Sequence, residues 1–476
     1  MNAPAHTSHA AYTYTYTYTY TYTYTYTYTY TAPPKLFAWM LTDPANPLLV
    51  GQVNRLQNND VSLAYSASWV ATGFALSADM PLGLNEYNPV HRRARQTTAP
   101  GALDDARPDH WGEKVIRYLY KPRGTHLFDY LYLAGDDRFG ALGLSSSDSV
   151  YTPFATSPLL RLQDAQSISE VAKIIQTGGE LNHQQRVLAS ADASLGGAKP
   201  KAVISIDGEQ WVLKLFNAEP VDQPLVKHAA MRLAALAGIN VVETLPVRLL
   251  SEHALSEHAL AIKRFDRYTK LGVAHRLHCV SAATVLRAET PPGEEPRYGY
   301  PHLARALRRS ANPATVKLQL LDLFRRMVFN ILMANTDDHE KNHSLVLRPQ
   351  GERGQAVLEL SKAYDIVPTG SGATAHKFLI GEDSPKPSLR LAMGGCAQFD
   401  LTPPAAAQVV QQVINVVNNW QTFFTGCGIS QRDMQELKLV IDRDDLLRER
   451  TQFSMADYPA TPANTARSRT PRNPFL

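Results

Sequence analysis

The stretch that decides the fold is Asn335-Thr336-Asp337-Asp338-His339-Glu340-Lys341-Asn342. It follows a long apolar pattern with helical spacing, residues 316–333, and it runs into an extended apolar stretch, residues 343–347. Catalytic groups are often carried by polar loops that a rigid scaffold positions. A polar loop between a buried helix and a strand therefore predicts a catalytic loop at residues 335–342.

The spacing of acidic and amide side chains indicates a particular chemistry for this loop. Asp337 stands five residues before Asn342. At this spacing a kinase catalytic loop carries the aspartate that takes the substrate's hydroxyl proton and the asparagine that holds a metal ion. Such chemistry also needs a second metal-binding carboxylate, and Asp365 follows another apolar run at residues 356–360. The three side chains together predict phosphoryl transfer, whereas the Asp-to-Asn spacing alone occurs often by chance.

Composition limits the class of protein. With 476 residues, of which 44% are hydrophobic and 19% charged, the chain matches a soluble globular protein of two or three domains. A formal charge of +4 is small for this length and does not favour a protein that binds nucleic acid by itself. The three cysteines lie far apart without metal-ligand spacing, which predicts free thiols in a reducing compartment. Since no apolar run approaches the ~20 residues of a membrane span and no apolar signal core is present, we expect a cytoplasmic protein without a membrane segment.

Both ends of the chain have compositions that do not predict packed structure. Tyrosine and threonine alternate from Tyr12 to Thr31. Period two is typical of a strand, but both faces are uniform and nothing fixes a register. We expect a disordered repeat at residues 1–33; the alternative is a tyrosine-rich segment that binds a partner or is modified. Residues 454–476 end in a Pro/Thr/Arg-rich run and are also predicted to be disordered.

Residues 34–150 are predicted to form a small β-rich module. Short strand patterns at residues 35–39 and 62–65 are separated by turn signals. Asp109 precedes a helical pattern at residues 113–120. A binding role for Asp109 is one interpretation, but aspartate is a preferred residue at helix N-termini, and we expect it to cap this helix.

A glycine-rich stretch with lysines, Ser194 to Lys201, is the second candidate for a functional site. Two strand patterns follow it, and Asp207-Gly208 between them predicts a β-hairpin. Such a loop can bring backbone N–H groups and positive charge to phosphates. Lys214 in the second strand stands where kinases keep the lysine that grips the α- and β-phosphates. The alternative is an ordinary glycine-rich turn with solvated lysines.

Apolar residues at helical spacing predict helices at residues 164–184, 225–237 and 316–333. The last of these is expected to be buried on the strength of its apolar residues, namely Leu318, Leu321, Phe324, Val328 and Leu332. Before it, a strand pattern that ends at Lys263 leads into Arg264-Phe265-Asp266-Arg267. A strand that leaves one lobe for a polar linker predicts a hinge that holds adenine, with a core position as the alternative for Phe265.

The assembled motifs resemble the HipA-like serine/threonine kinases, the toxin half of bacterial toxin–antitoxin systems. The resemblance runs from about Leu36 to Arg448. Its motifs are Asp105-Ala-Arg-Pro-Asp-His-Trp-Gly112, Gly135-Asp-Asp-Arg138, Ser194-x-x-Gly-Ala-x-Pro-Lys201, Arg264-Phe-Asp-Arg267, Asn335-x-Asp-x-His-x-Lys-Asn342 and Tyr364-Asp-Ile366. Several motifs in the right order are far more specific than any one of them.

This resemblance implies an α+β protein with a two-lobed protein-kinase-like fold, an N-terminal β-rich subdomain and a mainly helical C-lobe. The expected divisions are a disordered repeat (1–33), the β-rich subdomain (34–150), the kinase N-lobe with the glycine-rich loop (151–266), the helical C-lobe with the catalytic loop (267–453) and a disordered tail (454–476).

The resemblance also implies ATP and Mg²⁺ as cofactors, and it assigns roles to residues. Asp337 is expected to be the catalytic base, with Lys341 steadying the transferred phosphoryl group. Asn342 and Asp365 are the expected metal ligands. The expected nucleotide-binding residues are Ser194, Gly196, Gly197, Lys201, Lys214, Lys263 and Phe265. Ser194 matches the serine that such kinases can autophosphorylate to inactivate themselves, and His339 is expected to be a buried structural histidine.

One residue departs from the family pattern. The family usually carries a glutamate in the helix after the lysine strand, and the register places Lys227 there. A second lysine is expected to repel Lys214 rather than pair with it. Glu219 is a weak candidate for the missing carboxylate.

Two main functions follow from these observations. The first is a toxin-type kinase that phosphorylates a protein substrate related to translation, such as an aminoacyl-tRNA synthetase, and that is restrained by a small DNA-binding antitoxin. The second is a catalytically weak scaffold that acts as a corepressor with its antitoxin, which Lys227 favours and the Asp337, Asn342 and Asp365 set opposes. A small-molecule kinase with the same fold is a third interpretation. DNA is expected to be contacted only through the antitoxin.

Overall fold

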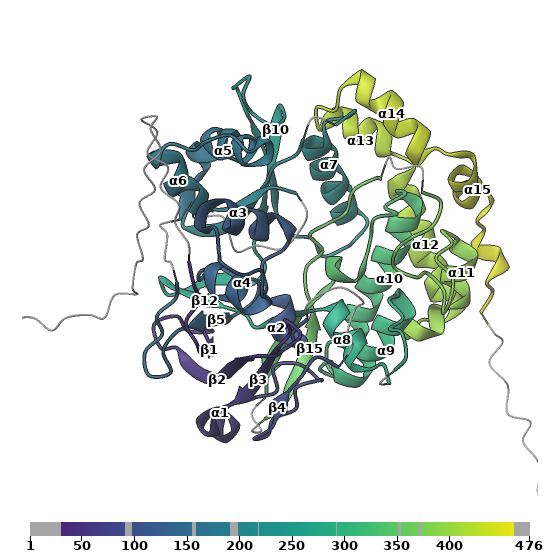
Figure 1. The fold of residues 1–476 in the computed structure, drawn as a ribbon. Coiled ribbons are helices and arrows are strands. Elements are labelled where there is room, and N and C mark those ends of the chain that lie inside the picture. Colours follow the sequence, from purple (N-terminus) through teal and green to yellow (C-terminus); the bar gives the residue numbers. More distant parts are fainter. Residues whose placement is uncertain are drawn as a thin grey trace, which may run out of the picture.

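The computed structural model describes residues 30–90, 98–154, 159–190, 199–217, 219–291, 293–350, 354–369 and 373–460. The predictions for nearly all of the Tyr–Thr repeat, for most of the C-terminal tail and for Ser194, Gly196 and Gly197 lie outside these residues. Figure 1 shows the helices from α8 to α15 (green to yellow) on one side of the molecule and the purple to teal β-rich parts on the other.

A five-stranded antiparallel sheet forms the N-terminal part, in the order β4-β3-β2-β1-β5. Leu36, Ala38 and Met40 alternate along β1 and are at most 1% exposed, because successive side chains of a strand point to opposite faces. The predicted strands near residues 35–39 and 62–65 are thereby confirmed. The elements of this part are β1 (Leu36–Met40), β2 (Leu48–Arg55), β3 (Val61–Tyr65), β4 (Glu86–Tyr87) and β5 (Leu142–Ser145), with α1 (Ala67–Thr72), α2 (Gly101–Asp105), α3 (His110–Tyr120) and α4 (Leu127–Leu133).

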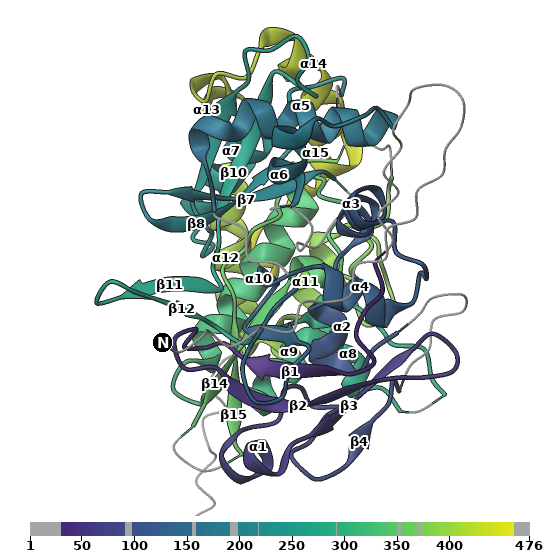
Figure 2. The same ribbon diagram turned by 60° about the vertical axis from the view of Figure 1, so that its left-hand side comes forward.

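A second five-stranded sheet, in the order β6-β7-β8-β10-β9, lies above the first in Figure 2. Its strands are β6 (Leu160–Arg161), β7 (Lys201–Ile206), β8 (Glu209–Lys214), β9 (Thr244–Arg248) and β10 (His258–Lys263). The predicted hairpin is confirmed as β7 and β8. Asp207 and Gly208 both have positive φ, 51° and 79°, as a two-residue type I′ turn requires.

The helices of this second part correct one prediction. Residues 164–184 do not form one helix, because α5 (Ala165–Thr177) ends at Gly178, whose φ of +75° is a left-handed conformation that glycine adopts readily. A second helix, α6 (His183–Ser190), starts after the break. The predicted helix at residues 225–237 corresponds to α7 (Gln223–Leu236), which Asp222 caps by accepting a hydrogen bond from the Leu225 N–H.

The remaining chain is mainly helical. Its helices are α8 (Ala282–Ala288), α9 (Tyr300–Ser310), α10 (Val316–Leu332), α11 (Leu389–Gly394), α12 (Pro403–Val417), α13 (Trp420–Gly426), α14 (Gln431–Ile441) and α15 (Asp444–Gln452). The strands here are the pair β11 (Arg267–Lys270) and β12 (Val273–Arg276), and the three-stranded set β13 (Cys279–Ser281), β14 (Ser344–Pro349) and β15 (Ala356–Leu360). Among the helices that the structure describes, none is long and apolar enough to span a bilayer.

Helix α10 confirms the predicted buried helix with one exception. Phe324, Val328 and Leu332 are fully buried, but Leu318 is 68% exposed. Leu318 lies on the outer face of the first turn, since Val316 packs against the core and Leu320 is buried, so the apolar spacing assigned Leu318 to the wrong face of the helix.

The N-terminal part does not have a core of its own. Apolar residues of β1 to β3 belong to the same buried cluster as those of α7, α10 and α12. Trp111 and Ile116 of α3 belong to a second cluster, together with buried residues of α5, β7 and β8. The N-terminal residues therefore pack against both other parts of the molecule, and Figure 1 shows α3 beside α5 and α6.

Candidate active site

The predicted catalytic loop begins where α10 ends, and the buried side chain of Asp338 anchors it. Ala334 has a positive φ of 52°, and the Asn335 N–H donates back to the Asn330 carbonyl at 3.0 Å, so the chain turns sharply out of the helix. The Asp338 carboxylate then accepts a hydrogen bond from the Tyr300 hydroxyl at 2.6 Å, and His343 Nε2 lies 3.1 Å from it. Burial opposes ionisation of Asp338, but His343 and Tyr300 hold its pKa below the ordinary value.

The two adjacent aspartates of the loop have opposite environments. The side chain of Asp338 is 2% exposed, whereas that of Asp337 is 54% exposed. The Asp337 backbone is steadied by Thr369, whose hydroxyl accepts from its N–H at 3.4 Å, and by Asn342, whose side-chain amide donates to its carbonyl at 3.5 Å. Asp337 is therefore the carboxylate of this loop that a substrate can reach, and Asp338 holds the loop in place.

Lys377 is the cation that contacts Asp337, and sequence reasoning missed it. Its ammonium forms an ion pair with the Asp337 carboxylate. The backbone holds Lys377 there, because its own N–H donates to Thr336 and the N–H of Phe378 donates to Asp338 at 2.9 Å. Phe378 is fully buried with its ring stacked on His343, 4.8 Å between centroids. No motif marks Lys377, which lies 40 residues after Asp337.

The structure places Lys341 and His339 differently from the expectation. Lys341 is exposed and lies near Asp104, whose pKa is lowered against the effect of burial by Arg287 and Arg107 and, to a smaller extent, by Lys341; within the described part of the chain it makes no contact with Asp337. The backbone carbonyl of Lys341 accepts from the Tyr364 hydroxyl at 2.5 Å. His339 is half-buried, and its Nδ1 caps the short turn Glu340–Asn342 by accepting from the Lys341 N–H. The buried histidine of the loop is instead His343.

The second predicted metal ligand, Asp365, is bracketed by two lysines. Lys214 donates to its Oδ2 at 2.9 Å, and Lys227 pairs with its Oδ1. The Asp365 carbonyl accepts from the Asn335 side chain at 3.5 Å, which joins this carboxylate to the catalytic loop. The shared carboxylate of Asp365 thus offsets the predicted repulsion between Lys214 and Lys227.

Burial and charge shift the pKa of each member of this triad. Burial disfavours the Asp365 carboxylate, but the two ammonium groups outweigh it and keep its pKa well below the ordinary value. For Lys214, burial is outweighed by Asp365, and its pKa is raised. For Lys227, burial dominates and lowers the pKa to about 7, against the opposing effect of Asp365. The three groups are therefore bound as one unit, and removing any of them changes the other two.

The two lysines of the predicted phosphate loop, Lys199 and Lys201, each contact a carboxylate. The side chain of Lys201 is 2% exposed, and its ammonium lies 2.7 Å from Asp109. Asp109 caps α3 as predicted, accepting from the Gly112 N–H at 2.8 Å. Lys201 lies opposite Lys214 in the antiparallel pair β7 and β8, so both side chains are on the same face of the sheet, and a phosphate contact by Lys201 stays a prediction. Glu219, the weak candidate partner of Lys214, pairs with Lys199 at 2.6 Å instead.

The predicted hinge is built from aromatic stacking and a buried ion network. The Phe265 ring stacks on Tyr364 with 5.3 Å between centroids and an angle of 19°, which joins the hinge to the residue before Asp365. Lys263 points to the surface, where Glu243 lies 3.2 Å from its ammonium. Arg264 and Asp266 are buried in an ion pair of 2.8 Å. Phe265 therefore has a core contact as well as a hinge position, and adenine binding by Phe265 and Lys263 stays a prediction.

The residues present fit a divalent cation in part. Carboxylate and amide oxygens are ligands that Mg²⁺ prefers. Asn342 uses its N–H₂ group toward Asp337, which leaves its amide oxygen as a possible ligand atom. The Oδ2 atom of Asp365 contacts Lys214, the lysine expected to move to the phosphates, whereas Oδ1 contacts the more deeply buried Lys227.

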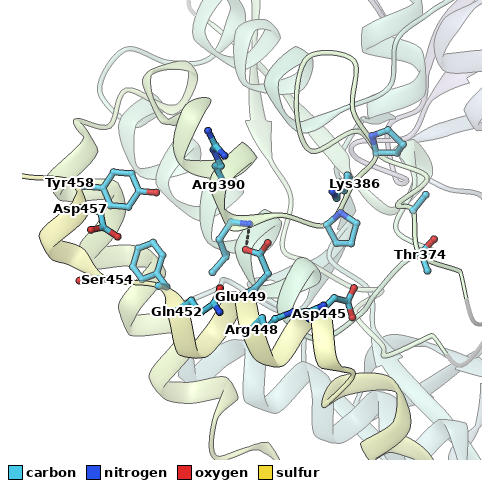
Figure 3. Close-up of a pocket in the computed structure, with 15 residues that line it drawn as sticks. Thr374, Lys386, Arg390, Asp445, Arg448, Glu449, Gln452, Ser454, Asp457 and Tyr458 are labelled. Carbon is cyan, nitrogen blue, oxygen red and sulfur yellow. Dashed lines mark hydrogen bonds between the residues drawn. The ribbon is translucent and has the colours of Figure 1, made fainter.

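A separate cavity of about 660 Å³ lies between the segment of residues 374–390 and the C-terminal residues 445–458. Figure 3 shows Arg390, Arg448 and Glu449 among its lining side chains. Glu449 accepts from the Leu389 N–H at 2.7 Å, which fixes one wall to α15. None of the predicted site residues lines this cavity, so its size gives no information about the nucleotide site.

Two family models match this chain. The HipA-like C-terminal domain matches residues 193–420, and the HipA N-terminal domain matches residues 45–145. The putative kinase Y4mE of Sinorhizobium fredii is 26% identical over 405 residues, which cover 80% of this chain and 84% of that protein. The serine/threonine-protein kinase toxin HipA of Shewanella oneidensis is 22% identical over 349 residues, covering 67% of this chain and 73% of the toxin.

A solved structure shows the same overall fold. The Shewanella oneidensis structure of HipA with HipB and operator DNA superimposes with a TM-score of 0.61 at 15% identity, covering 89% of this chain and 99% of that chain. The expected α+β class and two-lobed protein-kinase-like fold are confirmed. The domain boundaries and the site assignments stay predictions.

Proposed function

Because the chain belongs to the family of HipA-like kinases, we propose that it is an ATP-dependent serine/threonine protein kinase of the toxin–antitoxin type. The observation that carries the proposal is the reachable Asp337 carboxylate on a loop anchored by the buried Asp338. The same loop is joined through Asn335 to Asp365, and Asp365 contacts the strand lysine Lys214. The residues proposed as base, metal carboxylate and phosphate-binding lysine come from three distant parts of the sequence and are linked through these contacts.

The proposed mechanism depends on positioning and charge. Asp337 accepts the proton of the substrate hydroxyl as that oxygen attacks the γ-phosphorus of ATP, while the bond from the γ-phosphorus to the bridging oxygen breaks and ADP leaves. Lys214 would leave Asp365 for the α- and β-phosphates, and Asn342 and Asp365 would hold Mg²⁺. The metal ion, when bound, neutralises charge on the β- and γ-phosphates.

The finer parts of the proposal concern the substrate and self-inhibition. We propose a translation-related protein, such as an aminoacyl-tRNA synthetase, as the substrate, and Ser194 as the residue that the kinase phosphorylates on itself. A small DNA-binding antitoxin is the proposed partner, with DNA contacted through it. The solved relative supports this partner, since it stands in a complex with HipB and operator DNA.

The experiment that tests the proposed function is mass spectrometry of the full chain after incubation with Mg²⁺ and ATP. A single phosphate on Ser194 supports an active kinase that inactivates itself. No phosphate, with ATP binding retained, favours the corepressor scaffold, for which the engagement of both Asp365 oxygens by lysines is the supporting observation. Phosphorylated proteins in a lysate after incubation distinguish a protein kinase from a small-molecule kinase.

The Lys377→Ala variant is expected to transfer phosphate roughly tenfold more slowly, about 1.4 kcal/mol in activation free energy, with unchanged affinity for ATP. Lys377 contacts Asp337 and places a positive charge beside the position where the phosphoryl group is transferred. The rate of phosphate incorporation and calorimetric ATP binding measure the two effects. Lys377→Arg should keep most of the rate, and Lys386→Ala, on the same segment, should keep all of it. An unchanged rate in Lys377→Ala contradicts this role.

A further inference from the structure

Lys227 replaces a carboxylate with an ammonium in the middle of the proposed nucleotide site. Helix α7 carries this side chain, which pairs with Oδ1 of Asp365. The departure from the family pattern thus changes how the metal carboxylate is held. The chain has two lysines and one aspartate at this point, where the family pattern has a lysine, a glutamate and an aspartate.

The two lysines differ in their freedom to move. The side chain of Lys227 is 3% exposed, whereas that of Lys214 is 20% exposed. Helix α7 is fixed by its buried face, on which Val226, Ala230 and Met231 are at most 1% exposed, and its first turn is capped by Asp222. Lys214 can turn from Asp365 toward phosphates, but Lys227 has no solvent-exposed position to retreat to without unpacking α7.

The contact between Lys227 and Oδ1 of Asp365 affects how this carboxylate can bind metal ions. In kinases with two Mg²⁺ ions, the ions are held by one aspartate and the catalytic-loop asparagine. Lys227 donates a hydrogen bond to Oδ1 whether its amine is protonated or neutral, so it occupies one of the two lone-pair directions of that oxygen, and a cation on Oδ1 would have to lie beside the buried amine. Lys214 takes Oδ2 at 2.9 Å and frees it when it moves to the phosphates.

We propose that Lys227 keeps Oδ1 of Asp365 engaged in the nucleotide-bound state and thereby limits the site to a single divalent cation, bound through Oδ2. This inference rests on the proposed function. The buried amine takes the place of the second metal ion: it satisfies the same carboxylate oxygen and, when protonated, supplies positive charge beside the phosphates. The Lys227 position therefore specifies a one-metal site in this kinase.

The test counts metal ions with the full chain and a non-hydrolysable ATP analogue. Free Mn²⁺ is followed by electron paramagnetic resonance during a titration, so the readout does not depend on activity. We expect a single Mn²⁺ per chain for the wild type and a second, weaker one for Lys227→Met. Lys438→Met, which removes an exposed lysine on α14, should behave as the wild type.

The possible results separate the inference from the proposed function. Two Mn²⁺ ions in the wild type overturn the inference, as does a single ion in a folded Lys227→Met. Methionine matches the length of the lysine stem, and Asp365 keeps Lys214 as a partner, so the variant is expected to fold. If Lys227→Met fails to fold, the number of Mn²⁺ ions bound by the wild type still tests the inference. A wild-type chain that binds a single Mn²⁺ with the analogue but never transfers phosphate supports the inference and contradicts the kinase assignment.

Discussion

Replacing Asp337 by glutamine should lower the rate of phosphoryl transfer by about 10²–10⁴-fold, the range that a positioned general base contributes. The reason lies in the exposure of this carboxylate, the reachable acid of the catalytic loop, next to the Lys377 ammonium. Glutamine keeps a polar side chain, one methylene longer, but its amide cannot accept the proton of the attacking hydroxyl. Phosphate incorporation from ATP, followed by intact mass spectrometry, measures the loss.

The same substitution should leave the fold intact. The ion pair between Asp337 and Lys377 is exposed at both ends, 54% and 62%, and such pairs contribute about 0–1 kcal/mol. The neighbouring Asp338→Asn gives the matched contrast, since Asp338 is buried against Tyr300 and His343 and its loss should lower the unfolding temperature. If Asp337→Gln still incorporates phosphate at the wild-type rate, another group is the base.

The catalytic loop and the hairpin of the glycine-rich stretch were predictable because their signals are local. Helical spacing over residues 316–333, a polar loop and an apolar run define α10, the loop and β14 without reference to the rest of the chain. Asp207-Gly208 specifies a turn by backbone geometry alone, which the positive φ values confirm. The fold class followed from the family resemblance that the order of the motifs carries.

Contacts between distant residues could not be read in the same way. Lys377 reaches Asp337 because its backbone pairs with Thr336, a pairing that no spacing in the sequence specifies. Lys201 is held inside the protein by Asp109, 92 residues away, a partner that the sequence did not reveal. In both cases the partner of a charged side chain lies far away in the sequence, while the phosphate contact expected for Lys201 stays a prediction.

The arrangement around Lys227 could not be predicted from the charges of Lys227 and Lys214 alone. The helical register placed it correctly opposite Lys214, and two like charges were expected to repel. The structure places Asp365 between them, with one carboxylate oxygen for each ammonium. The predicted repulsion is present, since the Lys214 charge adds to burial in lowering the pKa of Lys227, but the pairwise reasoning missed the carboxylate that holds both lysines.

The Arg264→Met variant should lower the free energy of unfolding by about 3–5 kcal/mol, the cost of leaving buried charges without their partner. The side chain of Arg264 is 3% exposed. It donates to both oxygens of Asp266, at 2.8 and 2.9 Å, to Asp137 and, at 2.6 Å, to the carbonyl of Arg138. These contacts join the hinge to the N-terminal part, so the loss should also loosen that joint. Urea unfolding followed by circular dichroism measures the effect.

A surface pair of the same chemistry is the control for this prediction. Arg348 lies 2.7 Å from Glu359, with the two side chains 44% and 47% exposed, and Arg348→Met should cost at most about 0.5 kcal/mol. Equal costs for the two substitutions contradict the prediction, because the ion-pair distances are alike while Arg264 is buried and has more partners than Arg348.

The dependence on pH gives an independent check of the same network. Burial opposes ionisation of Asp266, but Arg264 and Arg267 outweigh it and hold its pKa below the ordinary value. In the wild type this carboxylate therefore stabilises the fold above its unfolded pKa of about 3.9, and the contribution is lost as the pH falls below that value. In Arg264→Met, burial of the Asp266 carboxylate is less offset by positive charge, so its pKa rises. Protonation at low pH then removes part of the free-energy cost of burying this carboxylate. The difference in unfolding free energy between wild type and variant should therefore narrow from pH 7 to pH 4; a difference that widens on acidification contradicts the role of Arg264 as the partner of Asp266.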